Sequence, residues 1–119
     1  MTLLNSIADR FSDRPFVWDD DMAASLVGKR VLVGVRKVDG SGTVNDERQM
    51  HGRVVEARCS SGILVQLEGT EAGRTFRLPP TTGNFDRADP GEYRLATTGE
   101  VVVDPDFVAT WEIKTPRRN

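Results

Sequence analysis

The spacing of apolar residues changes near residue 28 of the chain. Before that point they recur at helical intervals, and after it they alternate with polar residues. The first stretch carries one apolar stripe, formed by Leu3, Leu4, Ile7, Ala8 and Phe11. This stripe predicts a short amphipathic helix capped by Thr2. We expect the helix to end at Pro15, because proline cannot continue a helix.

A second short helix is expected to begin at Asp20 or Asp21 and to end at Val27. An aspartate at the start suits the helix dipole, and Gly28 suits the position just past the end. The side chains expected to face inward are Met22, Leu26 and Val27.

From residue 28 onward the period of two predicts strands separated by turn-forming residues. Six or seven short strands are expected, over residues 30–36, 47–58, 63–68, 75–78, 93–96, 100–103 and 107–113. The turn-rich residues 39–43 join the first two strands into a hairpin. Residues 79–91 are expected to form a loop, and residues 104–106 a turn.

The alternation also predicts which strand residues are buried. In the first strand one face, with Val31, Val33 and Val35, should be buried. In the last strand the inward residues should be Phe107, Ala109, Trp111 and Ile113. Gly34 and Gly52 lie inside two strands, where a missing side chain commonly marks a bulge or a bend.

These elements predict a mainly β fold: a small antiparallel SH3-like barrel with a short N-terminal helical extension. The extension should comprise residues 1–27, the barrel residues 28–113, and a basic flexible tail residues 114–119.

Composition agrees with one small domain. The chain has 119 residues, with 18 acidic and 16 basic side chains, so its formal charge is 16 − 18 = −2. No run is long and apolar enough to cross a bilayer, and the first residues lack the pattern of a secretory signal, so a cytoplasmic location is expected. Arginine outnumbers lysine thirteen to three, which suggests a bacterial coding sequence rich in G and C.

Several chemistries are disfavoured by the residues available. Cys59 is the only cysteine and His51 the only histidine, and eight residues of extended strand would hold them too far apart for a catalytic dyad. They also supply too few ligands for a structural zinc site. The loop that begins at Asp39 has Val44 and Met50 where a calcium loop needs glycine and glutamate. No metal, cofactor or catalytic residue is therefore predicted.

A weaker hypothesis is a carboxylate-based hydrolase or metal enzyme. Its site would span the 79–91 loop and Asp104 to Asp106. The carboxylates of the second half are Glu92, Glu100, Asp104, Asp106 and Glu112. No spacing in the sequence brings two of them together.

One charge asymmetry lies in the first hairpin. Residues 28–58 contain seven basic and four acidic side chains, a balance of 7 − 4 = +3. The candidate binding residues are Arg36, Lys37, Arg48, Arg53 and Arg58. Small barrels can bind nucleic acid along such a ribbon, with arginine on phosphate and aromatic side chains stacked on bases. The stacking aromatics are missing from this ribbon, so nucleic acid is the alternative partner.

Three segments resemble the first three strands of SH3-like and Sm-like small barrels: Gly28-Lys-Arg-Val-Leu-Val-Gly-Val, His51-Gly-Arg-Val-Val and Gly62-Ile-Leu-Val-Gln-Leu. The loop motifs through which Sm-like proteins contact RNA are absent. The segments Gly91-Glu-Tyr-Arg-Leu, Thr98-Gly-Glu-Val-Val-Val-Asp-Pro-Asp-Phe and Thr110-Trp-Glu-Ile are similar to a family of uncharacterised small bacterial proteins. That resemblance covers residues 28–113 and implies no activity.

The leading functional hypothesis is a non-enzymatic binding module. A compact β fold without an assembled catalytic constellation suits recognition of another protein. The contact would use an exposed strand edge or the acidic N-terminal extension.

Overall fold

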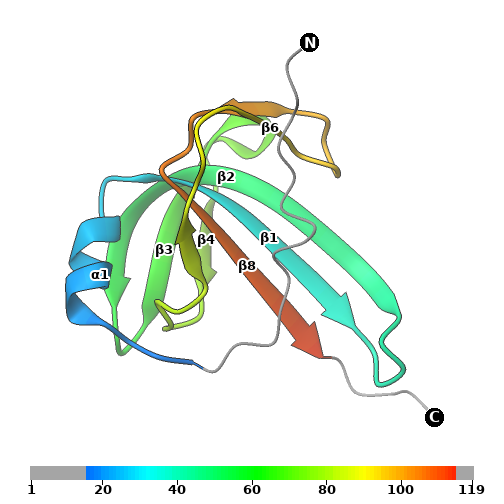
Figure 1. Ribbon diagram of the computed structural model, residues 1–119, viewed down its shortest axis with the longest axis horizontal. Coiled ribbons are helices and arrows are strands. Elements are labelled where there is room, and N and C mark those ends of the chain that lie inside the picture. Colours follow the sequence, from blue (N-terminus) through cyan, green and yellow to red (C-terminus); the bar gives the residue numbers. More distant parts are fainter. Residues whose placement is uncertain (1–15, 115–119) are drawn as a thin grey trace.

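The computed structural model describes residues 16–114, so the predicted first helix and most of the basic tail lie outside the described residues. Within this range the chain forms one α-helix, eight strands and a short 3-10 turn (Figure 1). The elements are α1 (Asp20–Leu26), β1 (Arg30–Val38), β2 (Val44–Arg58), β3 (Gly62–Leu67), η2 (Gly69–Glu71), β4 (Thr75–Leu78), β5 (Phe85–Arg87), β6 (Glu92–Arg94), β7 (Val101–Val103) and β8 (Phe107–Lys114).

The mainly β prediction is confirmed, but the sheet is not closed into a barrel. Six strands follow the order β4-β3-β2-β1-β8-β5, which leaves β4 and β5 as edges, and β6 and β7 form a separate two-stranded sheet. The first four strands are antiparallel neighbours, whereas β8 returns beside β1 in parallel. Alternation of side chains predicts which face is buried but not the direction of a neighbour, so the all-antiparallel prediction was wrong at this pair.

Helix α1 forms where the sequence predicts it. The Asp19 side chain caps its start by accepting a 3.0 Å hydrogen bond from the Met22 N–H. Ala23 and Leu26 are buried against the sheet. The prediction that Val27 faces inward was wrong: its backbone is already extended, and its side chain is 47% exposed.

The main core lies between α1 and one face of the six-stranded sheet. It brings together Leu26, Val31, Val33, Met50, Val54, Ile63, Val65, Leu67, Leu78, Phe85, Phe107, Ala109 and Trp111. Phe85 meets Trp111 edge to face, with ring centroids 5.6 Å apart. Ile113 was expected inside but is 42% exposed, because it lies near the end of β8, beyond the reach of this core.

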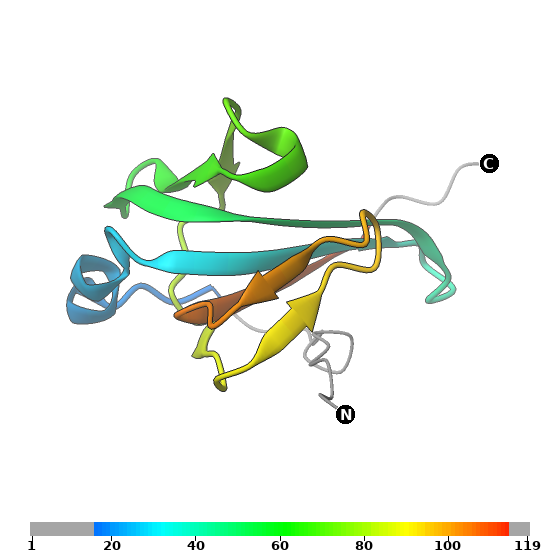
Figure 2. The same cartoon turned by 90° about the horizontal axis from the view of Figure 1, so that it is seen from above.

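A second, smaller core covers the opposite face of the sheet. The β6–β7 hairpin crosses β1 and β8, as Figure 2 shows from above, and it buries Tyr93, Leu95 and Val102 against Leu32 and Val108. The prediction that β1 has only one buried face was therefore wrong: Val31, Leu32 and Val33 are all buried.

Two further expectations about the second half need correction. The loop expected over residues 79–91 contains strand β5, which pairs with β8 from Phe85 to Arg87. Three residues are too few for a period of two to stand out. Strands β6 and β7 are confirmed but shorter than predicted. No helix among residues 16–114 is long and apolar enough to cross a membrane.

The bulges were expected at Gly34 and Gly52, but the register shifts lie elsewhere. They fall between Lys37 and Val38 and between Val54 and Glu56. Gly52 serves a different purpose, because β3 passes so close that a Cβ there would lie 2.1 Å from the Gln66 carbonyl oxygen.

The close approach at Gly52 makes a testable prediction. Gly52→Ala should lower the free energy of unfolding by about 3 kcal/mol, because β2 and β3 must separate to admit the methyl group. Gly40→Ala is the matched control, since a Cβ there meets nothing within 4 Å. Urea unfolding of both variants measures the effect, and equal stability would contradict the proposed contact.

Candidate functional site

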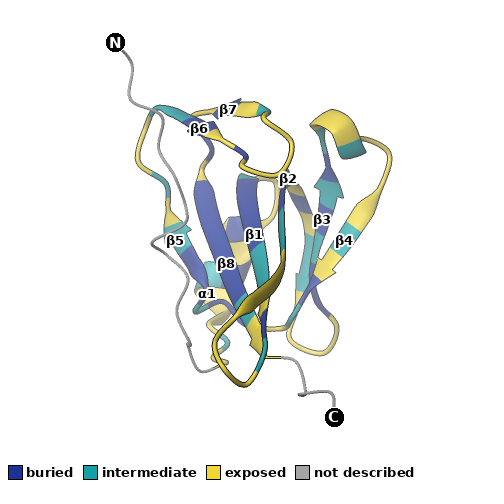
Figure 3. Cartoon of the chain, turned by 90° about the vertical axis from the view of Figure 1, so that its right-hand side faces the viewer, coloured by how far each residue is buried: buried dark blue, intermediate teal, exposed yellow. Residues whose placement is uncertain are grey.

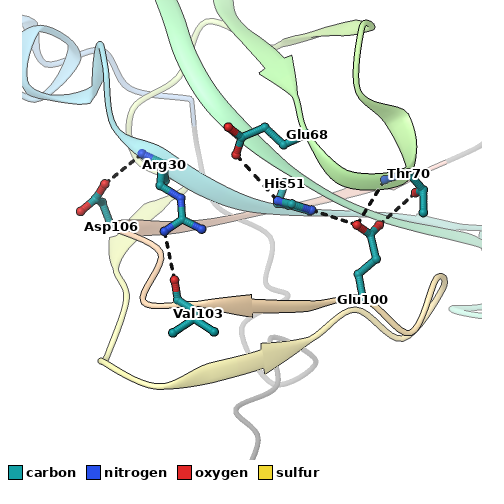
Figure 4. A network of polar contacts seen from close by, with 7 residues as sticks. All are labelled: Arg30, His51, Glu68, Thr70, Glu100, Val103 and Asp106. Carbon is teal, nitrogen blue, oxygen red and sulfur yellow. Dashed lines mark hydrogen bonds and ion pairs between the residues drawn. The ribbon is translucent and has the colours of Figure 1, made fainter.

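A cluster of polar side chains lies where β2, η2 and the start of β7 meet (Figure 4). The His51 Nε2 is 3.2 Å from the Glu100 Oε2. Thr70 donates to the same carboxylate twice, through its N–H at 3.2 Å and its hydroxyl at 2.9 Å. On the other side of the ring, the His51 Nδ1 lies 4.0 Å from the Glu68 Oε1. The cluster therefore joins three segments that are distant in the sequence.

Gly69 is the residue that allows this close assembly. Its φ of +73° is readily adopted only by glycine, and a Cβ would lie 1.9 Å from the Glu100 Oε2 and 2.6 Å from the His51 Nε2. No side chain fits between the η2 backbone and the contact of His51 with Glu100. In the sequence, Glu100 is one of several carboxylates of the second half and His51 is half of a disfavoured dyad with Cys59, and no spacing pairs the two residues.

The charge state of Glu100 follows from its contacts. Partial burial by itself would raise the pKa of this carboxyl, but hydrogen bonds from His51, Thr70 and Thr98 outweigh burial and hold the pKa below its ordinary value of 4.5. The Thr70 hydroxyl is bound to Glu100 and not to His51, so the order of contacts differs from that of a nucleophile activated by histidine. The arrangement fastens η2 to β2 and β7.

The tip of the β6–β7 hairpin is attached to β2 by a second set of bonds. The Gln49 N–H donates to the Thr97 hydroxyl oxygen at 3.3 Å, and the Gln49 side-chain oxygen accepts from the Ala96 N–H. The Glu68 N–H donates to the His51 carbonyl at 2.9 Å. These groups cover much of the outer edge of β2 in its middle section.

Two carboxylates of the weaker hydrolase hypothesis bind backbone N–H groups. Asp104 accepts from the Gly91 N–H at 2.7 Å, and Asp106 accepts from the Arg30 N–H at 2.9 Å. Glu92 lies on β6 and Glu112 on β8. Among residues 16–114 no three His, Cys, Asp or Glu side chains are arranged to hold a metal ion. Cys59 is free and exposed beyond the end of β2.

The five candidate binding residues of the basic hairpin do not share one surface. Arg36 pairs with Glu47 at 3.8 Å, on the face that carries the β6–β7 hairpin. Lys37 and Arg48 lie on the opposite face, where Arg48 binds Glu71 and stacks 5.1 Å from the Phe76 ring centroid. Arg53 and Arg58 lie farther along β2.

Arg53 and Arg58 belong to a surface that the sequence did not reveal. We call it the outer face; the register places on it Arg53, Glu56, Arg58, Leu64, Gln66, Thr75 and Arg77. Three guanidinium groups accompany one carboxylate. Glu56 is shared, at 3.4 Å from the Arg58 Nε and 3.9 Å from the Arg77 Nη1. Arg77 was missed because only the β3–β4 register lets its side chain reach across β3 to Glu56 on β2.

The outer face ends at an open sheet edge, strand β4. The Leu67 N–H donates to the Arg74 carbonyl, so these two residues form a hydrogen-bonded pair of the antiparallel β3–β4 ladder. Hydrogen-bonded and non-hydrogen-bonded pairs alternate along such a ladder. Phe76 and Leu78 therefore turn their backbone groups to β3, and Thr75 and Arg77 turn theirs away. No residue of the described part of the chain bonds to these outward N–H and C=O groups. Figure 3 shows exposed positions along β4 and deeply buried ones on β1 and β8.

Comparison with known proteins identifies no relative. No family model matches the chain, and no curated protein or solved structure matches it significantly. The resemblance to SH3-like barrels and to the small bacterial family stays a prediction.

Two glycines of one loop give a matched test of the polar cluster. Gly69 and Gly73 both have positive φ, +73° and +93°, but a Cβ at Gly73 meets nothing within 4 Å. Gly73→Ala should cost only the backbone strain, about 1 kcal/mol. Gly69→Ala should cost about 1–3 kcal/mol more, since it displaces the partly buried, hydrogen-bonded contact between His51 and Glu100. Equal unfolding free energies in urea would show that the cluster stabilises nothing.

The lowered pKa of Glu100 predicts a dependence on pH. A carboxyl with a depressed pKa contributes stability above its ordinary value of 4.5, and this contribution is lost as the pH falls through the lower value in the folded protein. Glu100→Gln should reduce stability by about 1–2 kcal/mol at neutral pH. The difference from the native chain should shrink in acid.

Thermal unfolding between neutral pH and about pH 3 measures this difference. Glu92→Gln, on the neighbouring strand β6, removes the same charge away from the cluster and serves as control. A gap that stayed constant with pH would contradict the role given to Glu100.

Proposed function

We propose that this protein is an interaction module that binds an extended segment of another protein along β4. The observation that carries the proposal is the pair of residues, Thr75 and Arg77, whose backbone groups point away from β3 at an exposed edge. A peptide strand placed there would form main-chain hydrogen bonds with both residues and become a seventh strand of the sheet.

Other edges are less suited to this role. The outer edge of β2 is occupied at Gln49 by Thr97 and at His51 by Glu68, and the register shifts near its start. Bulges and covering groups of this kind protect edges from pairing. Strand β4 has no register shift against β3, and Pro79 and Pro80 limit its length instead.

The polar cluster supports the proposal through its position in the chain. Residues 69–71 form η2, which is fastened by Thr70 to Glu100, and β4 begins four residues later at Thr75. The core residue Leu78 fastens the other end. An edge held at both ends loses little conformational entropy when it pairs with a ligand, which favours binding.

The test uses peptides of about six residues, which is the length of a common strand. Three peptides with blocked ends alternate valine with glutamate, lysine or serine. Nuclear magnetic resonance should show amide shifts at residues 74–79 with at least one of them. No shift there with any of the three at millimolar concentration would overturn the proposal.

Two variants at one position check that the contact is made by the backbone. Thr75→Pro removes an outward N–H and leaves the β3–β4 ladder intact, so it should weaken binding about tenfold, equivalent to about 1.4 kcal/mol. Thr75→Val retains the N–H and should bind like the native chain. Equal weakening by both substitutions would show that the peptide contacts only the side chain.

A further inference from the structure

We propose that the segment bound by β4 is acidic and alternates acidic with apolar side chains. The inference rests on the proposed function, because it concerns the partner of the same edge. It is drawn from the side chains on the two faces of β4, which an added strand would meet directly.

The outer face is cationic where the new strand would lie. A neighbouring strand places its side chains about 5 Å from those opposite. On this face they would stand beside Thr75 and Arg77, and the Arg77 side chain is 47% exposed. The nearest carboxylate, Glu56, already serves both Arg58 and Arg77. One carboxylate cannot balance two guanidinium groups, so an acidic residue on the ligand is favoured there and a basic one is repelled.

A second uncompensated cation precedes the edge. Arg74 is exposed, and within residues 16–114 no carboxylate lies within ion-pair distance of its guanidinium group. Arg74 lies three residues before Arg77, so the alternation of the strand does not place it on the outer face. Its charge still favours an acidic side chain near that end of the ligand, in addition to the one beside Arg77.

The opposite face of β4 favours apolar side chains on the ligand. It carries Phe76, which is half-buried at the rim of the main core, and Leu78, which is buried in it. Arg48 covers part of the Phe76 ring, and its charge is met by Glu71. An apolar side chain beside Phe76 would extend the main core and remove more of the ring from water.

Relative affinities of the three peptides test the inference. The valine–glutamate peptide should bind more tightly than the valine–serine peptide by about threefold to tenfold, and the valine–lysine peptide should bind most weakly. Raising the salt from about 0.1 M to about 0.5 M should reduce the preference, because exposed charges are then screened. If the serine and glutamate peptides bind equally well at β4, the proposed function survives and this inference fails. If none binds, the proposed function itself fails.

Charge variants locate the preference. The double variant Arg74→Gln/Arg77→Gln should lose most of the advantage of the glutamate peptide and keep its affinity for the serine peptide. Arg94→Gln, at an exposed residue of β6 in the other sheet, removes a charge of the same type and should change neither affinity. Retention of the advantage in the double variant would overturn the inference.

A short uridine oligomer distinguishes the other class of polyanion. It should shift few amides of β4, because nucleic acid cannot continue the backbone ladder. Displacement of the glutamate peptide from the edge by this oligomer at a similar concentration would assign the outer face to nucleic acid and overturn the inference.

Discussion

The parallel pairing of β1 with β8 is the constraint on which the rest of the fold depends. Both strands are buried on both faces: Val31 and Val33 face the main core, and Leu32 and Val108 face the second one. A strand buried on both sides must find two covering layers, since apolar surface left in water is unfavourable. Helix α1 and the ends of the curled sheet supply one layer, and the β6–β7 hairpin supplies the other.

The second layer explains why a histidine and a glutamate are partly buried in so small a protein. The hairpin has only two strands, so its apolar side chains cover Leu32 but do not extend over β2. Polar groups fill the space between the hairpin and β2. Partly buried polar atoms are stable only when they are hydrogen-bonded, and Glu100 meets this requirement through His51 and Thr70. The bonds from Thr70 to Glu100 also hold η2 in place, and η2 in turn positions the beginning of β4. The contact of Glu100 with His51 and Thr70 therefore both covers the second core and positions the β4 edge.

Local elements could be predicted from the sequence, whereas contacts between them could not. The position of β1, the start of α1 at Asp20 and the position of β4 follow from neighbouring residues alone. The parallel direction of β8, the burial of Leu32 and the proximity of His51 to Glu100 depend on residues that are 49 or more positions apart, or on a hairpin that covers a second face. Counting charges over residues 28–58 also joined side chains that the pleat separates, such as Arg36 and Arg48. Arg77 was outside that count, although its side chain reaches across β3 to Glu56 on β2.

The free edge is best understood from what the other edges require. An unpaired strand exposes donors and acceptors that can join any extended chain, and proteins usually shorten, bend or cover such a strand. In the described part of this chain β2 is bent and covered, β5, β6 and β7 have only three residues each, and β4, with four residues, is regular against its neighbour and open. Its charge limits the range of chains that it can accept, because Arg74 and Arg77 repel basic segments and Phe76 favours apolar contact. The edge can therefore accept a suitable partner strand but disfavours a second copy of β4, because that pairing would bring arginine side chains close together.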